Sequence, residues 1–477
     1  MNPLTCFKAY DIRGRLGVDL DEDIAYRIGR AFAQALGTKA VVLGRDVRAS
    51  SEALAASVAR GLVDESCRVL DLGLSGTEEM YFATSNFGAD GGICVTASHN
   101  PMDYNGMKMV RAGSAPLDAA TGLARIKALA EENAFAEANE RGSITDISDE
   151  ARVAYVDRVC SFTDIAALKP LKILVNAGHG TAGPTFDAIA ERMQGLGAPL
   201  VFERLFHEPD GTFPQGIPNP LLPENRPATA EAVRTSGADF GVAWDGDFDR
   251  CFFFDHTGSF IDGEYVVGLL AEAFLTKDPG ATIIHDPRII WNTQDIVAKA
   301  GGRAVQTRTG HAFIKQAMRD ENAVYGGEMS AHHYFRDFVF CDSGMIPWLL
   351  VAELVSRHGP LADLVAHRKT TFPSSGEINF TFEDPKAAIA RVRAAFEPQA
   401  IAIDEMDGFG FDLGDWRFNL RSSNTEPVVR LNVEARGDVN LVVEGVERVK
   451  SLLLGESPVF PPSGIEHFMN IITKSLA

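Results

Sequence analysis

AVVLGRDVRASSEALAASVARGLVDESCRVLDLG, residues 40–73, decides the fold class. AVVLG (40–44) and RVLDLG (68–73) are short apolar runs typical of buried strands. Between them, SSEALAASVARGLV (50–63) has the pattern of a crossover helix, and Ser50 or Ser51 is expected to cap its first turn. A strand, a helix and a second strand at this spacing predict a parallel βαβ unit.

The same alternation recurs along the chain. GGICVTAS (91–98) predicts a third strand, and strand-helix alternation restarts at LKILVNAG (171–178) and again at about residue 264. From about residue 371, runs such as WRFNLR (416–421) alternate apolar and polar residues, as half-buried antiparallel strands do. The sequence therefore predicts three α/β units followed by a smaller α+β domain.

Composition and charge narrow the class of partner. The 477-residue chain is 45% hydrophobic, and its 45 Lys and Arg against 65 Asp and Glu give a formal net charge of -20. That balance argues against nucleic acid and anionic membranes as partners but leaves open a small anionic substrate. The six cysteines show no CxxC spacing, and the sequence shows no signal-peptide pattern or membrane-spanning apolar run. We expect a cytoplasmic protein.

The loop TASHNPMDYNGMK (96–108) follows a predicted strand, where α/β sheets bind ligands. Ser98 is a candidate nucleophile beside His99, a candidate acid or base, and Lys108 is placed to neutralise an anion. A Ser/Asn/Pro turn with an incidental histidine is the alternative.

The loop DGDFDR (245–250) places Asp245, Asp247 and Asp249 directly after the apolar run FGVAW. Hard carboxylate oxygens suit Mg²⁺ or Ca²⁺. The alternatives are an acidic surface turn or a calcium loop, although the longer EF-hand pattern is absent. A metal site is favoured because three carboxylates this close repel one another without a cation.

Two further loops carry weaker patterns. In GGEMSAHHYF (326–335), Glu328 and Ser330 are suited to bind vicinal sugar hydroxyls, and the adjacent histidines are expected to make packing or polar contacts. RSSNTEP (421–427) combines a guanidinium group, hydroxyls, an amide and backbone N–H groups, which suit a phosphate, and Arg430 is placed to add a second guanidinium group. A plain turn is the alternative for both loops.

Six motifs, taken in order, resemble those of the α-D-phosphohexomutase superfamily, which comprises phosphomannomutases and phosphoglucomutases. They are FKAYDIRG (7–14), TASHNP (96–101), DGDFDR (245–250), the TGH of RTGHAFIK (308–315), GEMS (327–330) and RSSNTEP (421–427). The resemblance covers the whole chain and looks closest to bacterial phosphomannomutases that supply GDP-mannose for polysaccharide synthesis. It implies four domains around a central cleft, three similar α/β units with mixed sheets and a smaller α+β domain, at 1–152, 153–256, 257–370 and 371–477.

The resemblance also implies roles for individual residues. Ser98 matches the serine that is phosphorylated in the active enzyme, and an oxygen of its phosphate joins Asp245, Asp247 and Asp249 around one Mg²⁺ per chain. Glu328 and Ser330 match residues that hold two sugar hydroxyls. Arg421, Ser423, Asn424 and Thr425 match the clamp on the phosphate that the substrate already carries. Tyr10 and Arg13 match the opening segment near the phosphoserine. His99, Lys108 and His311 match polar residues near the reacting oxygens, and Arg250 matches a basic residue beside the metal loop.

Two positions depart from the family pattern. The metal loop usually reads DGDGD, but its second glycine is replaced here by Phe248, so the loop must accommodate a large side chain. Arg288 stands where many relatives carry a lysine near the sugar, which keeps the charge but replaces a compact ammonium by a planar fork.

The resemblance implies interconversion of mannose 6-phosphate and mannose 1-phosphate, and possibly of the glucose phosphates, through phospho-Ser98 and a hexose 1,6-bisphosphate that is both intermediate and activator. Phosphoglucomutase, phosphoglucosamine mutase, a metal-dependent sugar phosphatase and a non-catalytic sugar-phosphate sensor are the alternatives. We expect a monomer or homodimer without nucleic-acid or membrane partners. We also expect a fourth domain that hinges over the substrate and a locally positive site within an acidic chain.

Overall fold

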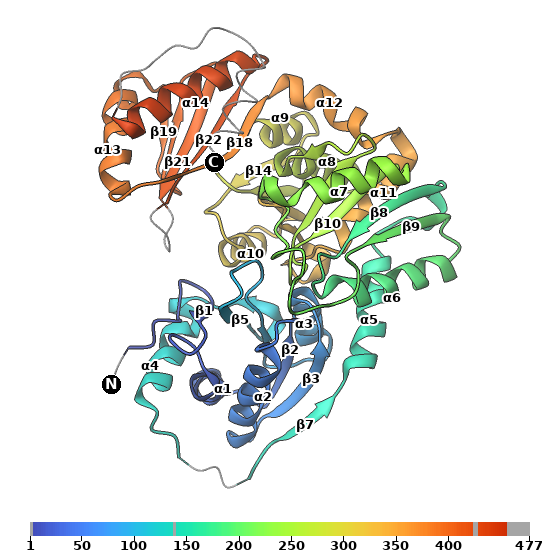
Figure 1. Cartoon of the computed structure of the whole chain (residues 1–477), viewed down its shortest axis with the longest axis vertical. Coiled ribbons are helices and arrows are strands. Elements are labelled where there is room, and N and C mark those ends of the chain that lie inside the picture. Colours follow the sequence, from blue (N-terminus) through green and yellow to red (C-terminus); the bar gives the residue numbers. More distant parts are fainter. Residues whose placement is uncertain (1–2, 137–139, 423–427, 456–477) are drawn as a thin grey trace. The chain divides into compact units, whose positions relative to one another are not determined.

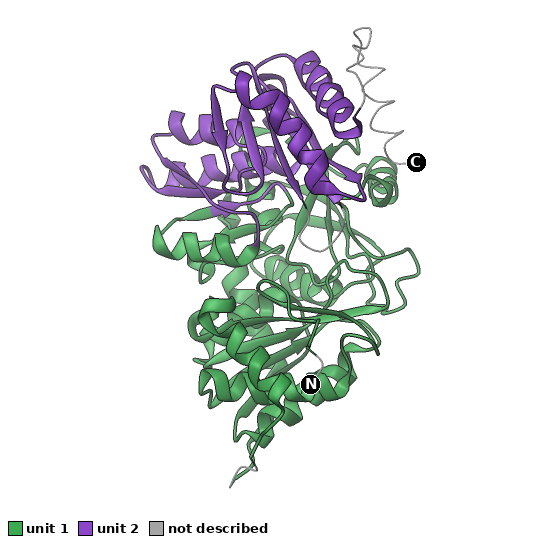
Figure 2. Cartoon of the chain, turned by 90° about the vertical axis from the view of Figure 1, so that its left-hand side faces the viewer, with its two compact units in different colours: residues 1–261, 311–325, 330–361 green, residues 262–310, 326–329, 362–477 purple. Residues whose placement is uncertain are grey.

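The structure is a computed structural model that describes residues 3–136, 140–422 and 428–455. Its strands form four sheets, which follow one another along the chain and are accompanied by helices (Figure 1). The chain divides into two compact units (Figure 2). Unit 1 comprises residues 1–261, 311–325 and 330–361, and unit 2 comprises residues 262–310, 326–329 and 362–477.

The first sheet has the strand order β1–β5–β4–β2–β3–β7, with β6 paired to β5. Its strands are β1 (Ile12–Arg15), β2 (Ala40–Arg45), β3 (Arg68–Leu74), β4 (Gly91–Val95), β5 (Tyr104–Arg111), β6 (Ala115–Pro116) and β7 (Ser143–Asp146). The accompanying helices are α1 (Glu22–Leu36), α2 (Ser51–Asp64), α3 (Thr77–Asn86), α4 (Ala124–Glu132) and α5 (Ser148–Cys160). The predicted βαβ unit is confirmed, because β2 and β3 pair in parallel on either side of α2 in the sequence.

Two local expectations need correction. Ser50 occupies the N-cap position of α2 but makes no capping hydrogen bond. Instead, the Asn105 side chain donates to both serine hydroxyls, and the Ser51 hydroxyl donates to Asp46. In addition, residues from about 117 to 160 form a polar, acidic tract whose composition favours helices, and it contains α4 and α5 but also strand β7. All four residues of β7 are exposed, so they give no apolar signal.

The second sheet has the order β12–β11–β10–β8–β9. Its elements are β8 (Leu171–Asn176), α6 (Ala182–Gly195), β9 (Leu200–Leu205), α7 (Pro227–Ser236), β10 (Phe240–Trp244), β11 (Cys251–Asp255) and β12 (Phe260–Ile261). Strand β10 runs parallel to β8 and antiparallel to β11. The DGDFDR segment therefore connects two adjacent, fully buried strands.

The third sheet has the order β14–β13–β15–β16–β17. Its strands are β13 (Thr282–His285), β14 (Arg303–Gln306), β15 (Tyr325–Gly327), β16 (His333–Phe335) and β17 (Cys341–Asp342). The helices of this region are α8 (Gly263–Lys277), α9 (Trp291–Lys299), α10 (His311–Asp320), α11 (Ile346–His358) and α12 (Leu361–Thr371).

The fourth sheet is antiparallel, with the order β18–β22–β21–β20–β19. Its elements are β18 (Ser374–Thr381), α13 (Pro385–Phe396), β19 (Ala402–Asp404), β20 (Phe409–Asp412), β21 (Trp416–Ser422), β22 (Val428–Ala435) and α14 (Val439–Leu454). Residues from α13, α14 and one face of the sheet form a single hydrophobic core. The smaller α+β domain predicted from the alternating pattern is confirmed.

The two-residue period of the strands decides which side chains are free for chemistry. On β5, Met107 and Met109 enter the core that α1, α2 and α4 cover, so Lys108 between them points to the opposite face.

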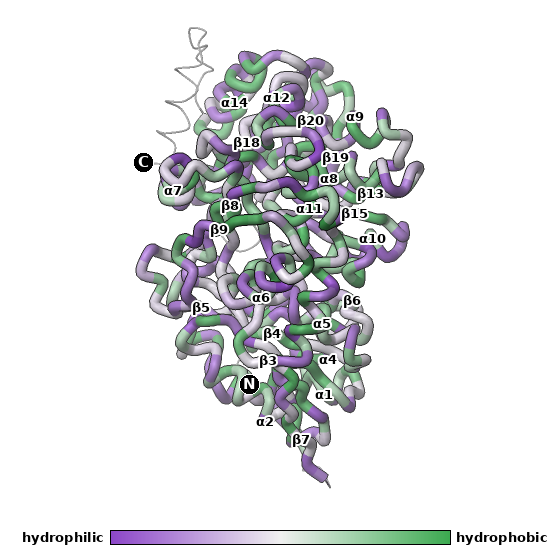
Figure 3. Tube along the Cα trace, turned by 90° about the vertical axis from the view of Figure 1, so that its right-hand side faces the viewer, coloured by the Kyte–Doolittle hydropathy of each residue, from purple (hydrophilic) through white to green (hydrophobic). Residues whose placement is uncertain are grey.

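Hydrophobic and hydrophilic stretches alternate along the whole described chain (Figure 3). Within those residues, no helix is both long enough and apolar enough to cross a membrane.

Candidate active site

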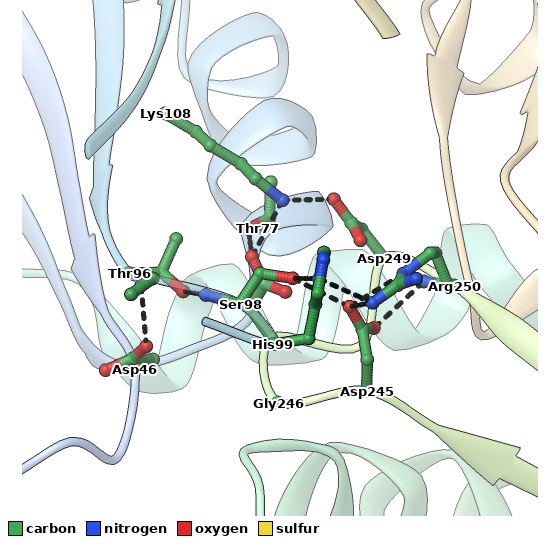
Figure 4. Close-up of polar contacts among 12 residues, drawn as sticks. Asp46, Thr77, Thr96, Ser98, His99, Lys108, Asp245, Gly246, Asp249 and Arg250 are labelled. Carbon is green, nitrogen blue, oxygen red and sulfur yellow. Dashed lines mark hydrogen bonds and ion pairs between the residues drawn. The ribbon is translucent and has the colours of Figure 1, made fainter. Parts of the chain in front are cut away.

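Ser98 lies in the loop that follows β4, and it is buried. Its φ of 49° is left-handed, a backbone conformation that is strained for a residue with a side chain and is common at functional sites. The Ser98 hydroxyl donates to Asp245 at 2.8 Å and lies 3.0 Å from Nδ1 of His99 (Figure 4). The candidate nucleophile is therefore held directly against the aspartate loop.

Arg48, which the motifs did not single out, holds the serine loop in place. Its buried guanidinium group donates to the backbone carbonyls of Ser98 at 3.0 Å, Asn100 at 2.5 Å and Pro101 at 2.9 Å. Strand β2, which precedes Arg48, pairs in parallel with β4, so the loops after both strands lie at one edge of the sheet. The sequence could therefore have indicated Arg48 only through its position just after a predicted strand that belongs to the same sheet.

Asp245, Asp247 and Asp249 are buried, and each offers a carboxylate oxygen within 4.8 Å of the others. Lys108 Nζ lies 2.8 Å from Asp247 and also pairs with Asp249. Arg250 forms a two-pronged ion pair with Asp245, at 2.9 Å and 2.7 Å. Two protein cations therefore offset much of the repulsion from which the sequence analysis favoured a metal ion.

Burial and these ion pairs set the charge states of the site. Burial opposes the charge of Lys108, but Asp247, Asp249 and Asp245 outweigh it and raise its pKa. Burial and the neighbouring Asp247 raise the pKa of Asp249 well above its usual range. Burial, followed by repulsion from Arg250 and Arg13, holds the pKa of His99 well below its usual range. Because Arg250 donates to Nδ1 of His99 at 2.7 Å, this imidazole acts as a neutral acceptor.

The donor set fits a hard divalent cation. Oδ1 of Asp247 and Oδ1 of Asp249 are buried and have no hydrogen-bond partner among the described residues. Three clustered carboxylates with the Ser98 oxygen beside them are the ligands that such ions prefer. The described residues thus contain an acidic cluster that could bind a metal.

Phe248 is accommodated by a glycine opposite it. The Phe248 side chain is fully buried, with a left-handed φ of 45°. A Cβ built on Gly76 would lie 2.2 Å from its ring. Directly after Gly76, the Thr77 hydroxyl donates to Asp247 at 2.6 Å, and the Thr77 N–H donates to the Asp247 carbonyl. The large side chain therefore packs where α3 meets the aspartate loop.

Other predicted residues of unit 1 lie around the serine loop or near one another. Arg13 donates to the Ala97 carbonyl at 2.9 Å, to the Asn100 side chain, and to Asp11 at 3.0 Å. Tyr10 and His311 pack edge to face, with ring centroids 4.7 Å apart. Neither ring nitrogen of His311 hydrogen-bonds to another described residue.

The adjacent residues His332 and His333 contact different partners, as expected for side chains that do not bind the same ion. His333 lies 2.7 Å from the Tyr325 hydroxyl. His332 Nδ1 lies 3.8 Å from Asp342, and together with Asp249 these two residues form a second group with metal-ligand spacing. Lys315 Nζ pairs with Asp342 at 2.7 Å. No sequence pattern predicted that His332 would lie beside Asp249 of the aspartate loop.

Apart from Ser330, the predicted sugar and phosphate residues that the structure describes lie in unit 2. Arg288 is buried, pairs with Asp286, and lies 3.6 Å from Glu328. Glu328 also accepts from the Gly310 N–H at 3.0 Å. Ser330 is half-buried and belongs to unit 1.

Two residues of the expected phosphate clamp lie on one face of the fourth sheet. Arg421 on β21 is directly opposite Arg430 on β22. Glu377 on β18, which the motifs missed, lies 3.1 Å from Arg421 and 3.7 Å from Arg430. Ser423, Asn424 and Thr425 lie outside the described residues.

Four consecutive regions match the domain models of one family, phosphoglucomutase/phosphomannomutase. Alpha/beta/alpha domain I matches residues 5–137, domain II residues 153–258, domain III residues 262–372, and the C-terminal domain residues 377–450. The chain belongs to the phosphoglucomutase/phosphomannomutase family.

Similar proteins match almost the whole of this chain. A phosphomannomutase of Salmonella montevideo is 60% identical over 456 residues, which cover 95% of this chain and 100% of that protein. A protein of Xanthomonas campestris named phosphohexose mutases is 56% identical over 453 residues, with the same coverage. A crystal structure of a phosphoglucomutase/phosphomannomutase family protein from Burkholderia thailandensis has a TM-score of 0.82 at 32% identity, covering 96% of this chain and 100% of that one.

Each region matched to the family contains at least one of the candidate residues. Ser98 lies in the domain I match, the three aspartates lie in the domain II match, and Glu328 lies in the domain III match. Arg421 lies in the match to the C-terminal domain. The candidate residues named from the sequence are thus distributed over all four matched regions.

Proposed function

We propose that the chain is a phosphomannomutase that interconverts mannose 6-phosphate and mannose 1-phosphate, with the glucose phosphates as further substrates. The observation that carries the proposal is the buried Ser98 hydroxyl, 2.8 Å from Asp245 and among the charged side chains of the aspartate loop. Identity of 60% to a phosphomannomutase over the full length of that protein supports this choice of sugar. The product would supply GDP-mannose synthesis.

In the proposed reaction, Ser98 carries a phosphoryl group. The bond from phosphorus to the serine oxygen breaks as a bond forms to O1 or O6 of the hexose monophosphate, whose hydroxyl proton passes to a nearby base. The resulting hexose 1,6-bisphosphate turns round and returns its other phosphate to Ser98. Arg48 orients the serine loop, and Lys108 and Arg250 place positive charge beside it.

Asp245, Asp247 and Asp249 would hold one Mg²⁺ together with an oxygen of the Ser98 phosphate. When bound, the ion would supply positive charge to stabilise the transferring phosphoryl group. The unpartnered oxygens of Asp247 and Asp249 support this assignment. Lys108, which bridges the same two carboxylates, would then share them.

The substrate would be held by residues of the regions that match domain III and the C-terminal domain. We assign Glu328 and Ser330 to bind the sugar hydroxyls. Arg288 is assigned to a position near the sugar. Arg421 and Arg430, with Ser423, Asn424 and Thr425, would bind the phosphate that is not being transferred. A clamp built from guanidinium forks suits a phosphate at either end of the sugar.

A coupled assay with mannose 1-phosphate tests the proposal. With Mg²⁺ and glucose 1,6-bisphosphate present, the protein should form mannose 6-phosphate, and Ser98→Ala should lose at least about a thousandfold in kcat. Glucose 1-phosphate and glucosamine 1-phosphate run in parallel to rank the sugars. The proposal fails if free phosphate accumulates without an isomerised sugar, if only glucosamine phosphate turns over, or if Ser98→Ala keeps full activity.

A further inference from the structure

The polar face of the fourth sheet brings two arginines together. On β21 and β22, the apolar residues Phe418, Leu420, Val429 and Leu431 enter the core with α13 and α14, so Arg421 and Arg430 point to the other face. The register places the two arginines directly opposite each other. Like charges in this position destabilise a sheet unless another group offsets them.

Glu377 supplies the offsetting charge. It lies on β18, next to β22, and its carboxylate is 3.1 Å from Arg421, 3.7 Å from Arg430 and 3.5 Å from Arg288. Its side chain is only 8% exposed. Burial opposes its charge, but Arg288, Arg421 and Arg430 outweigh burial and lower its pKa, so it stays ionised at neutral pH. One carboxylate is thus surrounded by three guanidinium groups, as a bound phosphate would be.

We propose that Glu377 is an internal anion of the phosphate clamp, which competes with the substrate phosphate for Arg421 and Arg430 and thereby weakens its binding. The inference rests on the proposed function, because it takes these two arginines as the clamp. A phosphate that enters must displace the carboxylate from Arg421, whereas a phosphate that leaves is replaced by it. The two half-buried guanidinium groups are then never left without a counter-charge.

Weak binding has a use in this reaction. The bisphosphate has to leave the clamp with one phosphate and re-enter it with the other in every turnover. A carboxylate that takes over the arginines makes release easier, so it should raise the turnover rate at the expense of affinity. Glu377 is therefore assigned as a positioning residue that sets a balance between KM and kcat.

Glu377→Gln tests this role, because it removes the charge and keeps the shape. Binding of inorganic phosphate and of mannose 1-phosphate is measured by calorimetry on the full chain, and KM and kcat are measured in the coupled assay. We expect both ligands to bind roughly tenfold more tightly, with KM and kcat both falling. Weaker or unchanged binding by Glu377→Gln would overturn the inference.

Control variants separate the possible failures. Asp295→Asn removes another carboxylate of unit 2 that pairs with an arginine, Arg368, and should leave binding unchanged. Arg421→Gln should weaken binding; if it does not, the clamp assignment in the proposed function fails instead. Should Glu377→Gln not fold, Glu377→Asp has to bind phosphate more tightly than the unmodified protein, because its shorter side chain withdraws from Arg421. Equal or weaker binding by Glu377→Asp would then contradict the inference.

Discussion

At the scale of single residues, Phe248 and Gly76 form a matched pair. Gly76 precedes α3 with a φ of −86° and a ψ of 168°, which an alanine also adopts without strain. The three atoms nearest to a Cβ at this position all belong to the Phe248 ring. The glycine is therefore required by the neighbouring side chain rather than by its own backbone.

Gly76→Ala should lower the free energy of unfolding by about 1–3 kcal/mol, because the new methyl group overlaps the Phe248 ring. In a Phe248→Gly background, the same substitution should cost close to nothing. Chemical denaturation of the two single variants and the double variant measures the coupling. Gly195→Ala, where an added Cβ meets nothing within 4 Å, is the matched control. Equal losses in both backgrounds would refute the pairing.

Residue types at strand ends could be predicted from sequence, but their partners could not. Ser98 and the three aspartates follow apolar strands, so their place at a sheet edge follows from the pattern. Arg48 and Glu377 contact their partners through pairings between distant strands, which no local pattern encodes. The roles assigned to the predicted residues stay predictions until they are tested.

At the scale of elements, unit 2 ties the fourth sheet to residues 262–310. Arg417 on β21 pairs with Glu434 on β22 at 2.6 Å and donates to the Arg288 carbonyl at 2.9 Å. Glu434 in turn accepts from the backbone N–H groups of Ile290 and Trp291, where α9 begins. A hinge that moves the fourth domain by itself, as the sequence suggested, would have to break these buried contacts.

Glu264 gives this junction a pH dependence. It lies near the start of α8, accepts from the Ser374 hydroxyl at the start of β18, and is buried. Burial, and then the neighbouring Asp262, raise its pKa from 4.5 to about 8. In the unfolded chain, Glu264 loses its proton once the pH exceeds its ordinary pKa of 4.5, whereas the folded protein keeps this proton up to about pH 8. The stability that this proton contributes to the fold is therefore lost as the pH rises from 4.5 to about 8.

Glu264→Gln, which does not titrate, should gain thermal stability relative to the unmodified protein as the pH rises through this window. We expect a relative gain in Tm on the order of 5 °C between about pH 5 and about pH 9. Differential scanning calorimetry at both pH values measures it, with Glu272→Gln on the exposed side of α8 as the control. A Tm difference that does not change with pH would contradict the assignment.

The elements that could be predicted from the sequence have either a continuous apolar run, as β2 and β3 do, or a regular apolar repeat, as α2 and β21 do. Strand β7 could not, since it lies at the edge of the first sheet with all four residues exposed. The Ser50 and Ser51 hydroxyls also could not be assigned, because tertiary contacts with Asn105 and Asp46 outcompete local capping.

At the scale of the whole molecule, the net charge of -20 repels an anionic substrate, so its binding has to depend on cations at the site. The sequence suggested a locally positive site, but the structure pairs the cations of that site with carboxylates. Lys108 pairs with Asp247, Arg250 with Asp245, and Arg421 with Glu377. The role proposed for Glu377 would make phosphate binding at Arg421 an exchange of one counter-charge for another.

The central claim is that Ser98 carries the phosphoryl group between the two ends of the sugar. Intact mass spectrometry with peptide mapping, on protein treated with glucose 1,6-bisphosphate and then with mannose 6-phosphate, tests it most directly. We expect one phosphoryl group on Ser98 after the first step. In the second step, a ³²P label carried by that group should move to the hexose phosphates, because each turnover returns the other phosphate of the sugar to Ser98. Absence of phosphorylation, or phosphorylation at another residue, would contradict the account.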